Sequence, residues 1–198
     1  MKTKTVIGYK FIQSDMKSQN GDCGWKIGEW KKHAGELELC NSGLHACIKP
    51  LDSLEYIYGD RWFVVEAKGE IKKGKDKFVA SEMRLIKELD VKKIVTWFAI
   101  ACARRSLKHY EKQYPDDRRP LDAIEAAEKY LKKPTLKNLE VLNEKISAAW
   151  SAAESAARSA ESAARSAAES AAWSAEKRWQ NKMLEKIIRE AMKCPRKL

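Results

Sequence analysis

The chain has 198 residues, of which 44% are hydrophobic and 34% charged, and 39 Lys and Arg against 28 Asp and Glu give it a net charge of +11. This composition allows one or two domains with hydrophobic cores and excludes a wholly disordered or collagen-like chain. The longest uncharged apolar run, Ile94 to Ala103, is shorter than the roughly 18 residues that span a bilayer. The amino terminus has no secretory hydrophobic segment, and five Cys is an odd count that suits a reducing compartment. We therefore expect a cytoplasmic protein without membrane contact.

Glycine and charge are unevenly distributed along the chain. All nine Gly fall within the first 75 residues, where they favour turns and bulges between strands. Residues 1–90 carry 16 basic and 14 acidic side chains, whereas residues 91–198 carry 23 basic and 14 acidic ones and no Gly. The sequence thus predicts an α+β protein, with a small mixed α/β domain over 1–90 and an all-α, alanine-rich bundle over 91–198.

Alternating β-branched and aromatic residues predict the strands of the first domain, and Gly, Asn and Asp predict its turns. A short helix is expected to begin at Pro50 and to end at Gly59-Asp60. The expected strands cover Thr5–Ile12, Trp25–Trp30, Glu36–Cys40, Arg61–Ile71 and Phe78–Ile86, and the expected turns cover Gln19–Asp22 and Lys72–Lys75.

Three capping signals predict the helices that follow. Asp90 is a plausible N-cap for a helix from Val91 to about Lys112. Pro120 suits the first turn of a second helix that ends near Lys133. Thr135 then caps a third helix.

A Ser-Ala-Ala-x repeat begins at Ser147 and predicts a helix over about 147–176, because Ala is the best helix former. Opposite charges in the x positions recur three or four residues apart and support the helix. One helix over residues 136–193 would be long for this protein, so we expect a break. The small side chains favour close helix packing in a bundle. A partner-binding helix or a self-associating coil is the alternative, and Trp150 and Trp173 at the ends of the repeat are binding candidates.

Cys40, His45 and Cys47 are the main candidates for site chemistry. They are weak metal candidates, because their spacing lacks the paired knuckles of zinc sites. Cys47 as a nucleophile with His45 as base lacks an orienting acid. We therefore expect no metal and no cofactor.

The basic excess raises the question of nucleic acid. Arg104-Arg105 and Lys72–Lys77 could contact phosphates, but no recognition motif accompanies them. The simpler interpretation is that both basic segments are solvated surfaces. An acidic surface on a nucleic-acid-handling host protein would attract the same charges.

The segment Glu36 to Cys47 reads Glu-Leu-Glu-Leu-Cys-Asn-Ser-Gly-Leu-His-Ala-Cys, after an opening strand with Tyr9-Lys10 and before a strand with Val64–Ile71. Over about residues 5–90 the chain resembles an uncharacterised domain common in phage and prophage proteins. That resemblance implies no activity.

A second pattern comprises Cys102–Leu107, Tyr110-Glu111, Tyr114–Pro120 and Ala123–Ala126. It is similar to an all-helical family of immunity proteins of bacterial toxin systems, whose consensus contains Asp-x-Arg-Pro. The resemblance implies a protein-binding or inhibitory bundle, with Arg104, Arg105, Arg118 and Arg119 as binding candidates beside His45 of the first domain. Asp116 or Asp117 could also cap the helix while Arg119 pairs with Glu111 or Asp117, which is a structural explanation of the motif.

A looser resemblance is to ADP-ribosyltransferases. Tyr9-Lys10, Gly43 to Cys47, Tyr56 and Glu82 follow the order of that family's elements, which implies an NAD cleft with Lys10, Tyr56 and Glu82 as catalytic residues. The first strand departs from the family pattern, because it has neither the expected Arg nor the expected His.

The hypothesis that we favour is a phage or prophage accessory protein that binds and inhibits a bacterial host-defence or toxin component without catalysis. An ADP-ribosyltransferase-like enzyme that uses NAD is one alternative, and a structural virion component is another. The oligomeric state and the partner are not evident from the sequence.

Overall fold

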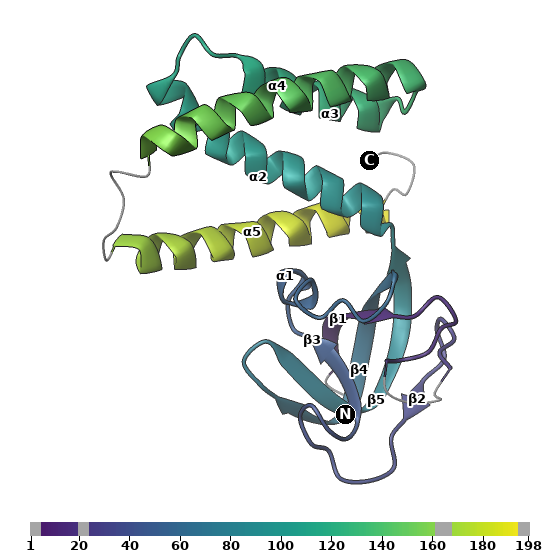
Figure 1. The fold of residues 1–198 in the computed structure, drawn as a ribbon. Coiled ribbons are helices and arrows are strands. Elements are labelled where there is room, and N and C mark those ends of the chain that lie inside the picture. Colours follow the sequence, from purple (N-terminus) through teal and green to yellow (C-terminus); the bar gives the residue numbers. More distant parts are fainter. Residues whose placement is uncertain (1–4, 20–23, 161–167, 194–198) are drawn as a thin grey trace. The chain divides into compact units, whose positions relative to one another are not determined.

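The structure is a computed structural model that describes residues 5–19, 24–160 and 168–193 (Figure 1). The chain forms two compact units. One unit contains the strands, the residues up to Ile94 and the helical segment from Leu184 onward, and the other runs from Val95 to Met183. The architecture is the predicted α+β combination of an antiparallel sheet and a helical region.

Among the described residues up to Asp90, the first unit has five strands and one short helix. Strands β1 and β3 pair with each other, β3 pairs with β5, β5 with β4, and β4 with β1, so four antiparallel strands close into a ring. Strand β2 extends one edge of β5. The elements are β1 (Val6–Ile12), β2 (Lys31–Lys32), β3 (Leu44–Cys47), α1 (Pro50–Ser53), β4 (Arg61–Lys73) and β5 (Lys77–Leu89).

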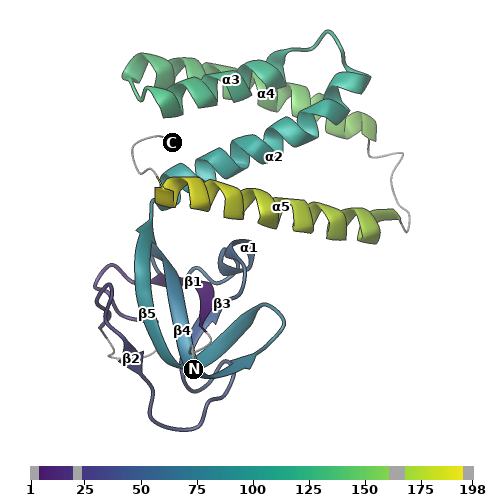
Figure 2. The same ribbon diagram turned by 180° about the vertical axis from the view of Figure 1, so that it is seen from behind.

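The long β4–β5 hairpin bends to close this ring (Figure 2). Its pairing register shifts between Val64 and Val65 and again between Lys68 and Ile71, and such bulges bend a strand and increase its twist. Gly69 lies in the second shift with φ +77°, a conformation that favours glycine.

Alternate residues of β4 and β5 point into the ring and form its core. Phe63 and Val65 of β4 and Phe78 of β5 are fully buried there, together with Met83 and Leu85. Trp62 faces the other side of β4, where its ring stacks on Phe11 at 5.4 Å and its Nε1 donates to Ser53 Oγ at 3.0 Å. Strand β4 is therefore buried on both faces.

Three predictions in the first domain were wrong. Trp25–Trp30 forms only an isolated bridge from Ile27 to Leu85, and Glu36–Cys40 is a bridge and turn rather than a strand. Both segments alternate because single side chains anchor irregular loops: Trp25 is buried, and its Nε1 donates to Ser18 Oγ at 2.8 Å. Helix α1 spans only four residues instead of continuing to Gly59. The turn predicted at Gln19–Asp22 lies mostly outside the described residues.

The four long helices cover the segments predicted to be helical, but the described parts of the predicted repeat helix, residues 147–160 and 168–176, belong to two of them. The four helices are α2 (Val91–Gln113), α3 (Arg119–Lys132), α4 (Leu136–Ala160) and α5 (Ala168–Lys193). Asp90 Oδ1 accepts the Lys93 N–H at 3.0 Å and Thr135 Oγ1 accepts the Asn138 N–H at 3.2 Å, so both predicted N-caps are confirmed.

In the second unit, α3 and α4 lie side by side in both views (Figures 1 and 2). Ile100 and Leu107 of α2 pack with Ile124 of α3 in a small buried cluster, and Trp97 covers its edge. Residues 161–167, between α4 and α5 and within the segment 136–193 where a break was expected, lie outside the described residues. Within the described parts of the chain, no helix has the length and apolarity needed to cross a membrane.

Candidate functional site

A cavity of about 480 Å³ opens in the first unit beside β1 and β3. Strand β1 contributes Tyr9, Lys10 and Phe11 to its wall, and β3 contributes Leu44 to Cys47. The remaining walls come from Trp25, the residues around His33, the turn Cys40–Gly43, Tyr56, Tyr58 and Lys77. These residues come from distant parts of the sequence, so the closed sheet is what brings them together.

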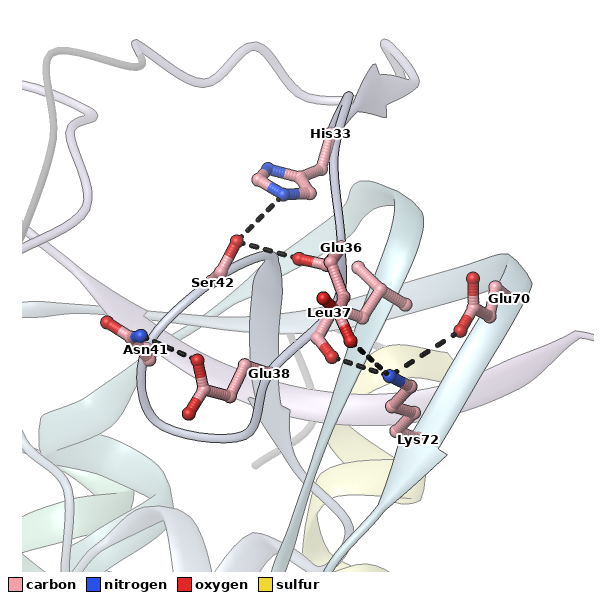
Figure 3. A network of polar contacts seen from close by, with 8 residues as sticks. All are labelled: His33, Glu36, Leu37, Glu38, Asn41, Ser42, Glu70 and Lys72. Carbon is pink, nitrogen blue, oxygen red and sulfur yellow. Dashed lines mark hydrogen bonds and ion pairs between the residues drawn. The ribbon is translucent and has the colours of Figure 1, made fainter.

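A polar network holds the turn that forms one wall (Figure 3). Ser42 Oγ donates to the Glu36 carbonyl oxygen at 2.8 Å, so its contact of 3.0 Å with His33 Nε2 requires that His33 be the donor. Lys72 Nζ donates to the Leu37 carbonyl oxygen at 2.8 Å. The loop between β2 and β3 is therefore fixed at several points along this wall.

His45 stabilises the same turn. Its Nε2 accepts the Cys40 N–H at 3.0 Å, and Cys40 has a φ of +68°, which is uncommon for a residue with a side chain. Burial lowers the pKa of His45, so the ring is neutral near pH 7 and can accept this bond. A protonated ring would instead donate to the Glu38 carbonyl oxygen, 3.2 Å from Nε2.

Cys47 is a buried residue of the cavity wall and a poor nucleophile. Burial, with smaller contributions from Asp76 and Asp52, raises its pKa to about 12, so the thiol stays protonated at neutral pH. Within the described ranges, no three His, Cys, Asp or Glu side chains gather closely enough to hold a metal ion, and this includes Cys40, His45 and Cys47.

The three residues of the transferase interpretation do not converge. Lys10 and Tyr56 line the cavity, whereas Glu82 is not among its lining residues. Glu82 instead pairs with Lys68 at 3.5 Å and with Lys32 at 3.9 Å. Lys68 in turn lies 4.1 Å from the centre of the Trp30 ring, so Glu82 belongs to a group that fastens the loop before β2.

Tyr56 has a defined role in the cavity wall. Its hydroxyl donates to Asp76 Oδ2 at 2.6 Å, which raises the pKa of Tyr56 and lowers that of Asp76. Lys77 Nζ lies 4.3 Å from the centre of the Tyr56 ring. Sequence reasoning missed Lys77 and Trp25 as cavity residues, because only the closed sheet brings them near β1.

In the helical unit, the arginine candidates of α2 bind neighbouring helices. Arg104 donates to Glu128 of α3 at 2.6 Å, and Arg105 donates to Glu176 of α5 at 2.7 Å. The guanidinium of Arg105 also lies 4.4 Å from the centre of the Trp179 ring. Both arginines therefore hold the bundle together, which leaves less of their charge for a partner.

The Asp-x-Arg-Pro segment is likewise joined to its own turn. Asp117 accepts hydrogen bonds from the Arg119 guanidinium at 2.9 and 2.6 Å and from the Tyr110 hydroxyl at 2.6 Å. Arg118 is largely exposed and lies 3.7 Å from Asp122. The predicted pairing of Arg119 with Asp117 is confirmed, and Arg118 is the more accessible of the two arginines.

Three exposed apolar side chains, those of Leu136, Ile146 and Trp150, lie on one side of α4, with the exposed Asn143 among them; we call these three residues the apolar stripe. These side chains are 80%, 49% and 73% exposed, respectively. At about 100° of rotation per residue they lie within roughly 80° of one another around the helix. Trp150 was expected from the sequence, whereas Leu136 and Ile146 were missed; their helical spacing was the available signal. The side chain of Trp173 lies outside the described part of the chain.

Comparison with known families gives two matches. Residues 6–96 match the model of a family described as Domain of unknown function (DUF7666), and residues 84–178 match one described as Imm-5 like putative immunity protein. The order of the two domains predicted from the sequence motifs is therefore confirmed. No curated protein and no solved structure gives a significant match.

Proposed function

We propose that this protein binds and inhibits a bacterial protein through the apolar stripe on α4, without catalysis. The observation that carries the proposal is the exposure of Leu136, Ile146 and Trp150 on one face of a helix. That helix lies within the residues that match the immunity-protein family. A family of that description supports a protein partner.

The chemistry of the stripe favours an apolar contact over an ionic one. Tryptophan is among the residues that most often dominate the binding energy of protein interfaces. Arg104, Arg105 and Arg119 are already engaged in ion pairs within the unit. The partner should therefore offer a hydrophobic groove that receives a helix face, and the protein's net positive charge would assist the encounter with an acidic rim.

The finer part of the proposal concerns the biological setting. We infer a phage or prophage accessory protein whose target is a toxin or a host-defence component. The resemblance of the opening domain to phage and prophage proteins supports this setting. Occlusion of the target's working surface would suffice for inhibition and requires no catalytic group.

Growth rescue in bacteria tests the proposal. The chain is co-expressed with each member of a panel of bacterial toxins that includes the product of the adjacent gene. We expect one toxin to be neutralised, and Trp150→Ala to abolish the rescue at equal protein level. Lys137→Ala is the matched control, because Lys137 is exposed and lies about 140° from Trp150 around the same helix.

The purified pair then gives the affinity. Trp150→Ala should weaken binding of the neutralised toxin at least about a hundredfold, as for a hot-spot tryptophan. Rescue that survives both Trp150→Ala and Ile146→Asp would refute the role of the stripe. If no toxin in the panel is neutralised, the proposal that the target is a toxin is refuted.

A further inference from the structure

The charged side chains that line the cavity of the first unit are basic. Among the described residues that line it are Lys10, Lys32 and Lys77, and none of the lining residues is an Asp or a Glu. The carboxylates beside its wall are already engaged, Glu82 with Lys32 at 3.9 Å and Asp76 with the Tyr56 hydroxyl at 2.6 Å. A concave site with one sign of charge and low-dielectric walls concentrates ions of the opposite sign. The cavity is therefore suited to an anion.

Lys10 is a lysine of this site without an ion pair to a carboxylate of the described residues. Its Nζ donates to the His45 carbonyl oxygen at 3.0 Å. Burial lowers its pKa to about 8, so the ammonium is still charged at pH 7 but poorly solvated. Lys10 is a half-buried side chain whose ammonium has no carboxylate partner, and a bound anion would supply the missing countercharge.

Aromatic rings form another part of the wall. Trp25 is buried with its ring centre 5.8 Å from Lys10 Nζ, and Tyr56 and Tyr58, whose ring centres lie 6.2 Å apart, are also lining residues. Flat apolar surfaces beside a cation suit a ligand that combines a planar ring with a charged group. A volume of about 480 Å³ is within the usual range for sites of small molecules.

We propose that this cavity binds a small anion of the size of a nucleoside monophosphate, with its phosphate at Lys10 and its ring against the aromatic wall. The ligand class follows from the ammonium without a carboxylate partner, the lack of acidic lining residues and the neighbouring rings. The site lies in the first unit and is independent of the α4 stripe, so either proposal can fail without the other.

Calorimetric titration of the full chain near pH 7 and low salt tests the site. The probes are AMP, GMP, CMP and UMP, with adenosine and inorganic phosphate as the separated parts of one of them. We expect at least one nucleotide to bind, and adenosine and phosphate each to bind at least about tenfold more weakly than AMP or its best-binding relative. Equal affinity for phosphate alone would show a simple anion site and would overturn the nucleotide class.

Substitution of the ammonium tests its role. Lys10→Met keeps the length of the side chain and should weaken binding of the nucleotide at least about tenfold. Lys26→Met removes the same charge from an exposed side chain outside the cavity and should leave the affinity unchanged. Circular dichroism confirms that both variants are folded. No binding by any of the four nucleotides, or equal affinity of Lys10→Met and the unaltered chain, would refute the proposal.

Discussion

The half-buried Lys10 should make the stability of this protein rise with pH above about pH 8. The pKa of Lys10 is lowered from 10.5 to about 8 in the folded state, mainly by burial. Each tenfold change in proton affinity corresponds to about 1.4 kcal/mol, so the charged form costs about 3 kcal/mol in the folded protein. Lys10→Met removes this cost and loses one hydrogen bond, to the His45 carbonyl oxygen, worth about 1 kcal/mol. We therefore expect the variant to be about 2 kcal/mol more stable at pH 7.

The sign of the pH dependence follows from the two protonation states. Below pH 8 the amine is protonated in both the folded and the unfolded chain, so the full cost is present. Between about pH 8 and 10.5 the unfolded chain binds a proton that the folded chain does not, and the stability contributed by Lys10 rises with pH. At pH 10 most of this cost has been recovered. The advantage of Lys10→Met should therefore disappear by pH 10.

Urea unfolding of both proteins at pH 7, 8.5 and 10 measures this difference. Other groups titrate in the same range: the pKa of Cys47 is raised to about 12 and that of Tyr9 is also raised, which lowers stability at high pH. The comparison with Lys10→Met removes their contribution, because both proteins contain them. A difference in unfolding free energy that stays constant from pH 7 to 10 would refute the argument that burial lowers the pKa of Lys10.

Three further predictions concern particular residues. Iodoacetamide at pH 7.5 should modify the exposed Cys40 well before the buried Cys47, which peptide mass mapping measures; equal rates would contradict the protonated state of Cys47. Gly8→Ala should lower the unfolding free energy by about 2 kcal/mol, because its Cβ would lie 2.6 Å from the Phe78 ring, whereas Gly24→Ala meets no atom within 4 Å and should change it by less than about 0.5 kcal/mol. Asp117→Asn should lower the melting temperature at pH 7, because hydrogen bonds from Arg119 and Tyr110 lower the pKa of Asp117 in the folded chain. This decrease in melting temperature should become smaller below about pH 4, where the Asp117 carboxylate is protonated in the unfolded chain before it is protonated in the folded one. A decrease that is the same at all pH values would exclude the ion pair with Arg119 as its cause.

The helices were predictable from the sequence because their signals are local. Asp90 and Thr135 are caps within three residues of the N–H groups that they satisfy, and Pro120 fits a first turn wherever the helix lies. The alternation in Trp25–Trp30 was misleading for the opposite reason. Trp25 is buried by the closed sheet rather than by strand pairing of its own segment, and a local pattern cannot separate these two causes.

Among the candidate site residues too, only those with a local signal in the sequence were recognised. Trp150 was recognised because tryptophan at the edge of an alanine repeat stands out in the sequence. The ion pairs of Arg104 and Arg105 could not be foreseen from the sequence, because their partners Glu128 and Glu176 lie 24 and 71 residues away along the chain. The charge of the cavity could not be foreseen, since it depends on which strands close the ring and on the side of β1 that carries Lys10.

The two folding units do not coincide with the two segments that match known families. The matched segments end at residues 96 and 178, whereas the first unit also takes in the helical segment from Leu184. In that segment Ile188 is 2% exposed, and Lys87 of β5 donates to the Met192 carbonyl oxygen at 3.1 Å. The last helical turns therefore belong with the sheet that carries the cavity. A chain cut after the first matched segment would lose these contacts, so both the nucleotide titrations and the toxin assays require the full chain.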